Sequence, residues 1–226
     1  MTTEPLAATR QPLTKDRVLA AAIELADREG IDALSMRRLG QSLGVEAMAL
    51  YRHVRDKDDL LDGVVEAVVA GIDLPPKDAD RAKDWRADMR TLAIDSRQQM
   101  LRHPWAPPLL VRRTTVGPAT LRHVDTVLGI LSRAGFSIEM AHHALHVLGS
   151  RVFGFTQDPF DESTDADTDP AQSAAFAAAI APTLPHVAEL ALAASHDGAL
   201  GGCDDDVEFA FGLDLILDGL ERQRTS

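Results

Sequence analysis

Residues 30–62 read GIDALSMRRLGQSLGVEAMALYRHVRDKDDLLD and decide the fold of this 226-residue chain. Ser35 is a suitable N-cap for a short helix over 36–43, and Gly44 closes that helix because glycine adopts a positive φ at little cost. After a tight turn, a second short helix is predicted over 46–53. Two short helices joined by such a turn are typical of a helix-turn-helix, whose second helix can enter the major groove of DNA.

Longer helices are predicted on both sides of this stretch. The first begins after Thr14 as N-cap, carries an apolar stripe and stops at Gly30. The other is capped by Asp56 or Asp58 and ends before the prolines at 75–76. Helical spacing continues beyond them, whereas alternating β-branched runs are absent and the chain holds no asparagine for an Asn-Gly hairpin turn. The fold class is therefore predicted to be all-α.

The rest of the chain is predicted to form further helices at about 84–102, 118–134, 138–153, 170–195 and 207–222. Prolines within 104–108 are expected to interrupt the helical pattern, whereas Pro182 and Pro185 lie inside the predicted helix over 170–195. Residues 158–169 are acidic and poor in large apolar groups. They are expected to form a mobile loop.

Charge is unevenly distributed along the chain. The formal net charge is −12, and residues 156–208 contain twelve acids and neither Lys nor Arg, so this segment alone accounts for the deficit. Residues 35–57 instead carry five Lys and Arg against two acids. A local basic surface is therefore expected in a protein too acidic to coat nucleic acid through its total charge.

Composition excludes other classes of protein. Cys203 is the single cysteine of the sequence, so an intramolecular disulfide cannot form, and without a basic neighbour its thiol is expected to be inert. The sequence has no run of about 18 apolar residues, and it begins without the basic and apolar regions of a signal peptide. A soluble, cytoplasmic protein with no membrane partner is expected.

The residues themselves carry a family resemblance. Over 14–73 the chain is similar to the DNA-binding domain of TetR-family transcriptional regulators. The matching features are the leading helix that ends in Gly30, the Leu39-Gly40 step, Leu43-Gly44-Val45, the run Leu50-Tyr51-Arg52-His53-Val54 and the Lys57 to Leu61 start of the connecting helix. After Pro76 the chain resembles the tetracycline-repressor branch, through Asp84-Trp85, Arg133-Ala134-Gly135-Phe136-Ser137, Phe153-Gly154, Phe209-Ala210-Phe211-Gly212-Leu213-Asp214 and Ile216-Leu217-Asp218-Gly219-Leu220.

This resemblance implies a domain organisation and a function. It implies a flexible N-terminal arm at 1–13, a three-helix helix-turn-helix DNA-binding domain at 14–74, and a helical ligand-binding and dimerisation domain at 75–226, joined by a connecting helix. It also implies a repressor that binds a palindromic operator on double-stranded DNA as a homodimer and is released by a small-molecule effector. No cofactor is expected. The alternative is a module that binds a small molecule or a protein, but not DNA, through the same helical dimer.

The side chains predicted to contact DNA project away from the apolar face of the two short helices. Arg37 can make a bidentate contact to guanine, and Lys57 lies near a helix N-terminus that favours a phosphate. Tyr51 is placed for a phosphate or, alternatively, is partly core. The full set is Ser35, Met36, Arg37, Ala47, Met48, Ala49, Tyr51, Arg52, His53 and Lys57.

The middle of the predicted recognition helix lacks side chains that form hydrogen bonds. Residues 47–49 read Ala-Met-Ala, which can touch thymine methyl groups but cannot bond base edges. Specificity is therefore expected to depend on Arg37, Arg52 and the shape of the DNA. The alternative for Arg37, Arg38 and Arg55 is that they form a solvated face without a role in binding.

A mostly apolar ligand pocket with few polar anchors is predicted in the C-terminal domain. The histidine through which tetracycline repressors coordinate magnesium would fall at about Val111, and Asp158, near the place of an acidic helper, is expected to be solvated. Magnesium and tetracycline are therefore not expected as ligands. The candidate pocket residues, some of which alternatively belong to the core, are Trp85, Met89, Leu92, Met100, Trp105, Leu109, Val127, Leu131, His146, Phe153 and Phe155.

The last two predicted helices carry more apolar surface than a small domain needs for its own core. In the tetracycline-repressor branch, helices in these places pair with their symmetry mates as a four-helix bundle. A two-fold dimer is therefore expected, with part of this apolar surface serving as core. The candidate dimerisation residues are Phe176, Ile180, Leu184, Phe209, Leu213, Ile216, Leu217 and Leu220.

Histidines raise the question of a metal. His142 and His146 are four residues apart on one helix face, a spacing that can hold zinc, with His103 or His123 to complete the site. Histidines on a half-buried helix more often bond one another, a carbonyl or a ligand, so no metal site is expected. Glu139 and His142 form one Glu-x-x-His spacing, but a carboxylate-bridged catalytic metal site needs a second copy on another helix, which the sequence lacks. Gly-x-Ser-x-Gly is also absent, so the protein is not expected to be an enzyme.

Overall fold

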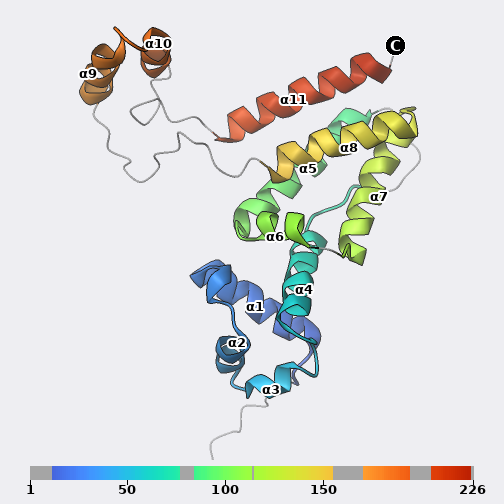
Figure 1. Cartoon of the computed structure of the whole chain (residues 1–226). Coiled ribbons are helices and arrows are strands. Elements are labelled where there is room, and N and C mark those ends of the chain that lie inside the picture. Colours follow the sequence, from blue (N-terminus) through green and yellow to red (C-terminus); the bar gives the residue numbers. More distant parts are fainter. Residues whose placement is uncertain (1–11, 77–83, 114, 155–169, 194–204, 225–226) are drawn as a thin grey trace, which may run out of the picture. The chain divides into compact units, whose positions relative to one another are not determined.

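The computed structural model describes residues 12–76, 84–113, 115–154, 170–193 and 205–224. Within these ranges the chain forms α-helices and one short 3-10 helix and contains no strand, which confirms the predicted all-α class (Figure 1). No helix among the described residues is long and apolar enough to span a lipid bilayer. The candidate pocket residue Phe155, the acidic stretch 158–169, Cys203 and most of the predicted N-terminal arm lie outside these ranges.

The first four α-helices follow the predicted pattern. They are α1 (Lys15–Glu29), α2 (Met36–Leu43), α3 (Ala47–Leu50) and α4 (Lys57–Ala70), with the 3-10 helix Ile31–Ala33 between α1 and α2. Thr14, Ser35 and Asp56 cap α1, α2 and α4. Each side-chain oxygen accepts a hydrogen bond from the backbone N–H three residues further on, at 3.2, 3.3 and 2.8 Å. Of the two predicted caps for α4, Asp56 is the one used.

The second helix of the helix-turn-helix is shorter than predicted. α3 ends at Leu50 instead of His53, because the following turn tightens. The N–H groups of Arg52 and His53 donate to carbonyls three residues back, at 3.4 and 2.8 Å, as in a 3-10 turn. The tight turn brings Val54 into the core, where it is 2% exposed.

Two glycines allow the connection between α2 and α3 to close. Gly44 has a left-handed backbone with φ of 65°, which is less costly for glycine than for a residue with a Cβ. At Gly40 the constraint is space, because a Cβ there would lie 2.8 Å from the carbonyl oxygen of Val45. The turn therefore packs directly against α2, and Leu39 of α2 and Leu50 of α3 are fully buried.

Seven further α-helices follow along the chain. They are α5 (Trp85–Arg102), α6 (Ala106–Arg112), α7 (Pro118–Arg133), α8 (Ile138–Phe153), α9 (Pro170–Ile180), α10 (Pro185–Ala193) and α11 (Asp205–Arg224). α6 was not predicted, because its prolines were expected to interrupt the pattern. Pro107 and Pro108 instead occupy the first turn of the helix, where a missing N–H breaks no helical hydrogen bond.

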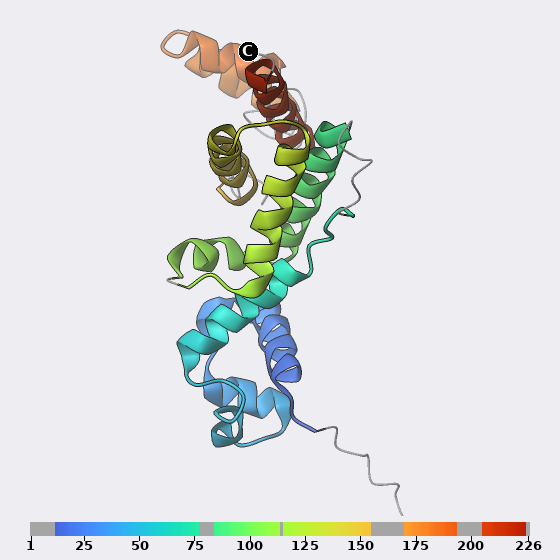
Figure 2. The same ribbon diagram turned by 90° about the vertical axis from the view of Figure 1, so that its right-hand side faces the viewer.

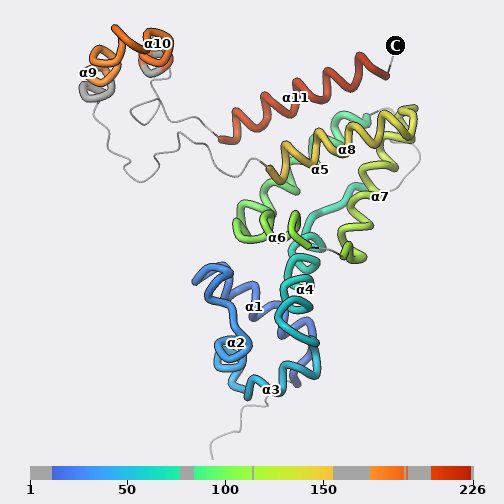
Figure 3. Tube along the Cα trace, in the orientation of Figure 1, coloured from blue at the N-terminus to red at the C-terminus, as the bar shows by residue number. Residues whose placement is uncertain are grey.

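The prediction of a single helix over 170–195 is wrong. The chain forms α9 and α10, which pack on each other as a hairpin, with Ala177 and Ala188 buried (Figure 3). One helix cannot continue through this region because Pro182 and Pro185 have no N–H to donate and their rings disfavour helical backbone at the preceding residue. Proline at the start of α10 is tolerated for the same reason as in α6.

The chain divides into two compact units. The first comprises residues 1–77 and 94–127 and the second residues 78–93 and 128–226, so the divisions fall within α5 and α7. In the first unit α4 packs against α1 and, further along, against α6 (Figure 2). Its core includes Val18 of α1 and, on α4, Leu60, Val64 and Val68, all at most 1% exposed.

In the second unit α11 packs antiparallel against α8. Arg151 near the end of α8 donates to the carbonyl of Glu208 near the start of α11. Arg224 at the end of α11 donates to the carbonyl of Ala134, just before α8, at 3.0 Å. Three side chains of α5 add bonds to α11: Trp85 to Glu221 at 2.9 Å, Arg86 to Asp218 at 2.6 Å and Arg90 to Asp214 at 3.1 Å.

Glu66 joins α4 to the start of α7 within the first unit. Its carboxylate accepts hydrogen bonds from the Arg113 guanidinium, the Ala119 N–H and the Thr120 hydroxyl, each at 2.7 Å. The Arg113 side chain is 6% exposed and that of Glu66 is 18% exposed. Burial by itself raises the pKa of Glu66, but the hydrogen bonds from Thr120, Arg113 and Ala119 outweigh it, so the pKa lies below its ordinary value.

Replacing Glu66 tests this connection. Glu66→Ala should lower the free energy of unfolding by about 2–4 kcal/mol at neutral pH, because Arg113 stays buried without its partner. Since the folded pKa is lowered, the stabilisation is complete above the ordinary carboxyl pKa and is lost as the pH falls through the folded value. The difference between wild type and variant in urea unfolding should therefore shrink on acidification.

Asp62→Ala is the matched control for this variant. Asp62 lies one turn earlier on α4 and accepts a hydrogen bond from the exposed Thr115 at 2.9 Å. Its loss should cost about 1 kcal/mol or less. Equal losses for the two variants at neutral pH would show that Glu66 has no special part in holding α7.

Candidate nucleic-acid interface and ligand-binding region

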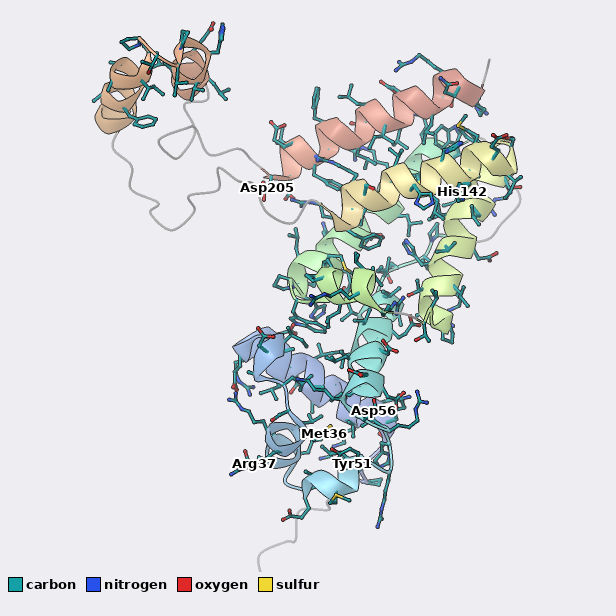
Figure 4. All side chains as sticks on the ribbon, in the orientation of Figure 1. Met36, Arg37, Tyr51, Asp56, His142 and Asp205 are labelled. Atoms are coloured by element: carbon teal, nitrogen blue, oxygen red, sulfur yellow. The ribbon has the colours of Figure 1, made fainter. Side chains whose placement is uncertain are left out.

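The ten residues predicted to contact DNA lie on α2, on α3 and in the turn that leads to α4. Arg37, Met48, Tyr51, Arg52 and Lys57 are exposed, and Ser35, Met36, Ala47, Ala49 and His53 are half-buried. Tyr51 is 44% exposed, which argues against the alternative that its ring belongs to the core. Arg37 reaches outward from α2 (Figure 4). The set therefore forms an accessible surface around the helix-turn-helix.

Two arginines near this surface form ion pairs with acidic side chains of the same chain. Arg38 pairs with Glu29 of α1. Arg55 pairs with Asp59 at 3.3 Å. The Arg55 backbone N–H, which donates to the same carboxylate at 2.8 Å, is the main cause that holds the pKa of Asp59 below its ordinary value.

Three cations of the predicted DNA-contacting set form no such ion pair with the described residues. Among the residues that the structure describes, Arg37, Arg52 and Lys57 make no ion pair and all three are exposed. They come from α2, from the turn after α3 and from the first residue of α4. A polyanion that approaches this surface thus meets positive charge from three successive elements, without the need to break an internal ion pair.

An apolar side chain lies between these cations along the chain. Met48 of α3 is 74% exposed, and its neighbours Ala47 and Ala49 are half-buried. The Ser35 hydroxyl already accepts a hydrogen bond from the Arg38 N–H. The arrangement can touch thymine methyl groups through Met48 and bond base edges or phosphates through its arginines.

The candidate pocket residues are distributed over both compact units. Most are buried, namely Trp85, Met89, Leu92, Met100, Trp105, Val127 and Leu131, while Leu109 and Phe153 are half-buried and His146 is exposed. The two indole N–H groups are already used, since Trp85 donates to Glu221 at 2.9 Å and Trp105 to Asp27 of α1 at 2.7 Å. A ligand beside these rings would meet their apolar faces.

The first unit contains a cavity of about 670 Å³ that the sequence analysis did not predict. It lies between α1, α4 and the segment 113–122, and none of the candidate pocket residues lines it. Leu19, Ile23 and Ala67 contribute apolar surface, and Glu66 and Arg113 are among its charged residues. The sequence held no signal for it, because its walls come from three separated segments of the chain.

The candidate dimerisation residues face two directions. Phe209, Leu213, Leu217 and Leu220 are buried within the chain, Ile180 and Ile216 are half-buried, and Phe176 and Leu184 are exposed. The exposed large apolar residues of α11 are Val207, Phe211 and Leu215, at 60%, 62% and 55%. None of these three was predicted to be a dimerisation residue, although their i, i+4, i+8 spacing places them on one helix face.

No group of three or more His, Cys, Asp or Glu side chains in the described part of the chain is arranged to hold a metal. Two histidines of α8 nevertheless lie close together, with the ring centroids of His142 and His146 4.6 Å apart. The described residues of a single chain therefore do not form a metal site by themselves.

Comparison with known proteins decides the family. Residues 76–224 match the family model described as "Tetracyclin repressor-like, C-terminal domain", and residues 18–64 match "Bacterial regulatory proteins, tetR family". The chain belongs to the TetR family. It is therefore a DNA-binding transcriptional regulator, of a family that is not enzymatic, and its C-terminal region is of the tetracycline-repressor type, as the resemblance implied.

Individual relatives agree with this assignment. The TetR-family chain is 30% identical over 223 residues to the HTH-type transcriptional repressor DrrR1 of Streptomyces coeruleorubidus, covering 96% of this chain and 80% of that protein. It is 39% identical over 128 residues to an HTH-type transcriptional regulator of Saccharopolyspora erythraea, covering 57% of this chain and 53% of the relative. The crystal structure of the TetR-family protein ActR of Streptomyces coelicolor in complex with actinorhodin is similar with a TM-score of 0.74, at 26% identity over 96% of this chain and 100% of that one.

Single substitutions separate base contacts from phosphate contacts in this TetR-family protein. Arg37→Ala should weaken binding to the duplex that the protein selects by about 1–3 kcal/mol, with a smaller effect on random DNA. Lys57→Ala should weaken both duplexes alike and reduce the slope of log affinity against log salt by about 1. Fluorescence anisotropy at several salt concentrations measures both quantities.

Arg38→Ala is the matched control for Arg37→Ala. It removes the same charge from the neighbouring position of α2, but its guanidinium is held by Glu29. Its effect on the selected duplex should be smaller than that of Arg37→Ala. If Arg37→Ala and Lys57→Ala both reduced binding to selected and random DNA equally, the assignment of Arg37 to base contact would be wrong.

Proposed function

We propose that the protein is a dimeric repressor that binds a palindromic operator and releases it when a small, largely apolar effector binds. The DNA-binding domain comprises residues 14–74, and the ligand-binding and dimerisation domain residues 75–226. The observation that carries the proposal is a set of exposed cations around the exposed Met48, namely Arg37, Arg52 and Lys57, which form no ion pair with any residue that the structure describes. Because its target is the chromosome, the protein acts in the cytoplasm.

The symmetry of the operator follows from the symmetry of the proposed dimer. Two helix-turn-helix elements related by a two-fold axis read two inverted half-sites, with centres about one helical turn, ~34–36 Å, apart. One element offers few base contacts, because α3 carries no hydrogen-bonding side chain at 47–49. Two half-sites together supply the affinity and specificity that one lacks.

Selection of bound sequences from a random duplex pool at two salt concentrations tests the proposal. Enrichment of a palindrome with half-sites about one helical turn apart, and affinity that falls steeply with salt, are expected. The protein is unfolded in denaturant, dialysed and refolded before selection, so that a bound organic effector does not mask the activity. Failure to enrich any sequence would contradict operator binding and favour a module that binds a small molecule or a protein instead.

A second copy of this chain is the proposed occupant of the outer face of α11 and α8. This face carries Phe211 and Leu215 on α11 and Val147 on α8, each about half or more exposed at 62%, 55% and 47%. Such an apolar stripe on two adjacent antiparallel helices matches what a helical bundle between two chains buries. The buried Leu213 and Leu217 on the opposite side hold α11 to its own chain.

Phe211→Glu should weaken the dimer by about 100-fold or more, because it places a charge in an apolar interface. Sedimentation velocity at low micromolar concentration should then show monomers, and operator affinity should fall with the loss of the second half-site. Leu121→Glu, at a 56% exposed position of α7, is the control and should remain dimeric. A Phe211→Glu variant that sediments as the wild type does would refute this interface.

The effector is proposed to bind in the C-terminal domain. Buried apolar side chains of α5 and α7, such as Met89, Leu92 and Leu131, are suited to an apolar molecule that would replace or rearrange part of the core. The relative ActR was crystallised with actinorhodin bound, which supports an organic effector. An effector that binds the conformation unable to span both half-sites releases DNA through its differential affinity.

A further inference from the structure

Three histidines share the outward side of α8. His142 (Figure 4), His143 and His146 are exposed. The ring centroid of His142 lies 5.9 Å from that of His143 and 4.6 Å from that of His146. In the part of the chain that the structure describes, none of the three rings has a hydrogen bond or ion pair. By contrast, His103 lies 2.8 Å from Asp27 and is used within the chain.

The spacing of His142 and His146 is the one by which a helix presents two ligands to one metal ion. Residues i and i+4 are neighbours on a helix surface, and two histidines at this spacing form half of the zinc site in helical metal-binding motifs. Imidazole nitrogen suits zinc and other borderline divalent ions. With centroids 4.6 Å apart, the two rings need only rotate about their side-chain bonds to face a common ion.

The described residues of one chain do not complete such a site. Zinc in structural sites takes four ligands, and no group of three or more suitable side chains gathers among the described residues. Since the described part of the chain offers no further ligand beside these two histidines, the site is assigned to two molecules and not to one. Because α8 is one of the two helices of the proposed dimer face, the molecule that approaches these histidines is another copy of the same chain.

We infer that His142 and His146 of two copies together form an intersubunit site for one zinc ion. The inference rests on the proposed dimer, in which Val147 of α8 and Phe211 of α11 lie on the outer face. We place His142 and His146 at the two-fold axis of this dimer, where each half-site is completed by its own symmetry mate. Four imidazoles satisfy the tetrahedral preference of zinc.

The site gives the dimer a dependence on metal. Zinc held by two chains binds the dimer and not the separated monomers, so it shifts the monomer–dimer equilibrium by mass action. Only a dimer spans both half-sites of a palindrome. Zinc therefore raises the affinity for the operator by favouring the dimer, without contact between the metal and DNA. This is a second input, distinct from the organic effector.

Calorimetric titration of the EDTA-treated full-length protein with zinc chloride tests the site. One zinc ion per two chains is expected, and His142→Ala and His146→Ala should each abolish measurable binding, because each removes two of four ligands. His186→Ala, which removes an exposed histidine of α10, is the matched control and should bind zinc as the wild type does. Zinc binding that is unchanged in His142→Ala and His146→Ala would overturn the assignment.

Sedimentation velocity in EDTA and in zinc distinguishes two outcomes: the zinc-site proposal is wrong, or the proposed dimer itself does not form. A stronger dimer with zinc in the wild type, and no such gain in His146→Ala, supports the intersubunit site. Dimers that form equally with and without zinc, together with absent zinc binding, overturn the metal site and leave the proposed dimer intact. One zinc per chain that persists in Phe211→Glu overturns the sharing of the ion between two copies.

Discussion

The hydrogen bonds that converge on Glu66 are the constraint on which the first compact unit depends. By sequence Glu66 belongs to the helix that follows the helix-turn-helix, whereas Arg113, Ala119 and Thr120 come from the region matched to the C-terminal domain of tetracycline repressor-like proteins. A partly buried carboxylate and a buried guanidinium are costly to separate. The first turn of α7 therefore stays with α4, and Trp105 adds a similar bond to Asp27 of α1.

Charge acts locally in this protein. The formal net charge of −12 opposes approach to DNA, yet the helix-turn-helix exposes cations in three successive elements. The structure distinguishes members of one basic stretch that look alike in the sequence, because Arg38 and Arg55 are held by Glu29 and Asp59. Electrostatic attraction to a phosphate backbone depends on the cations that remain available and on their distance from the acids, and both are local quantities.

α11 has two apolar faces, of which one is buried and the other is exposed. Leu213 and Leu217 are buried against the chain's own helices, and Phe211 and Leu215 are exposed. The sequence predicts an excess of apolar surface on this helix, but the dimerisation residues predicted from it lie largely on the buried side. A helical pattern shows that a residue is apolar and which neighbours share its face. It does not show which of two apolar faces meets the chain's own core.

Local features of this protein were determined by sequence alone. The caps Thr14, Ser35 and Asp56, the turn at Gly44 and the all-α class depend on contacts within a few residues, so they could be predicted from spacing. The end of α3, the break between α9 and α10, the cavity beside Glu66 and the pairing of Arg38 depend on segments distant in sequence or on competition between packing and local preference. Only the tertiary structure decided these, because the free energy of burying a side chain or satisfying a charge depends on which distant groups surround it.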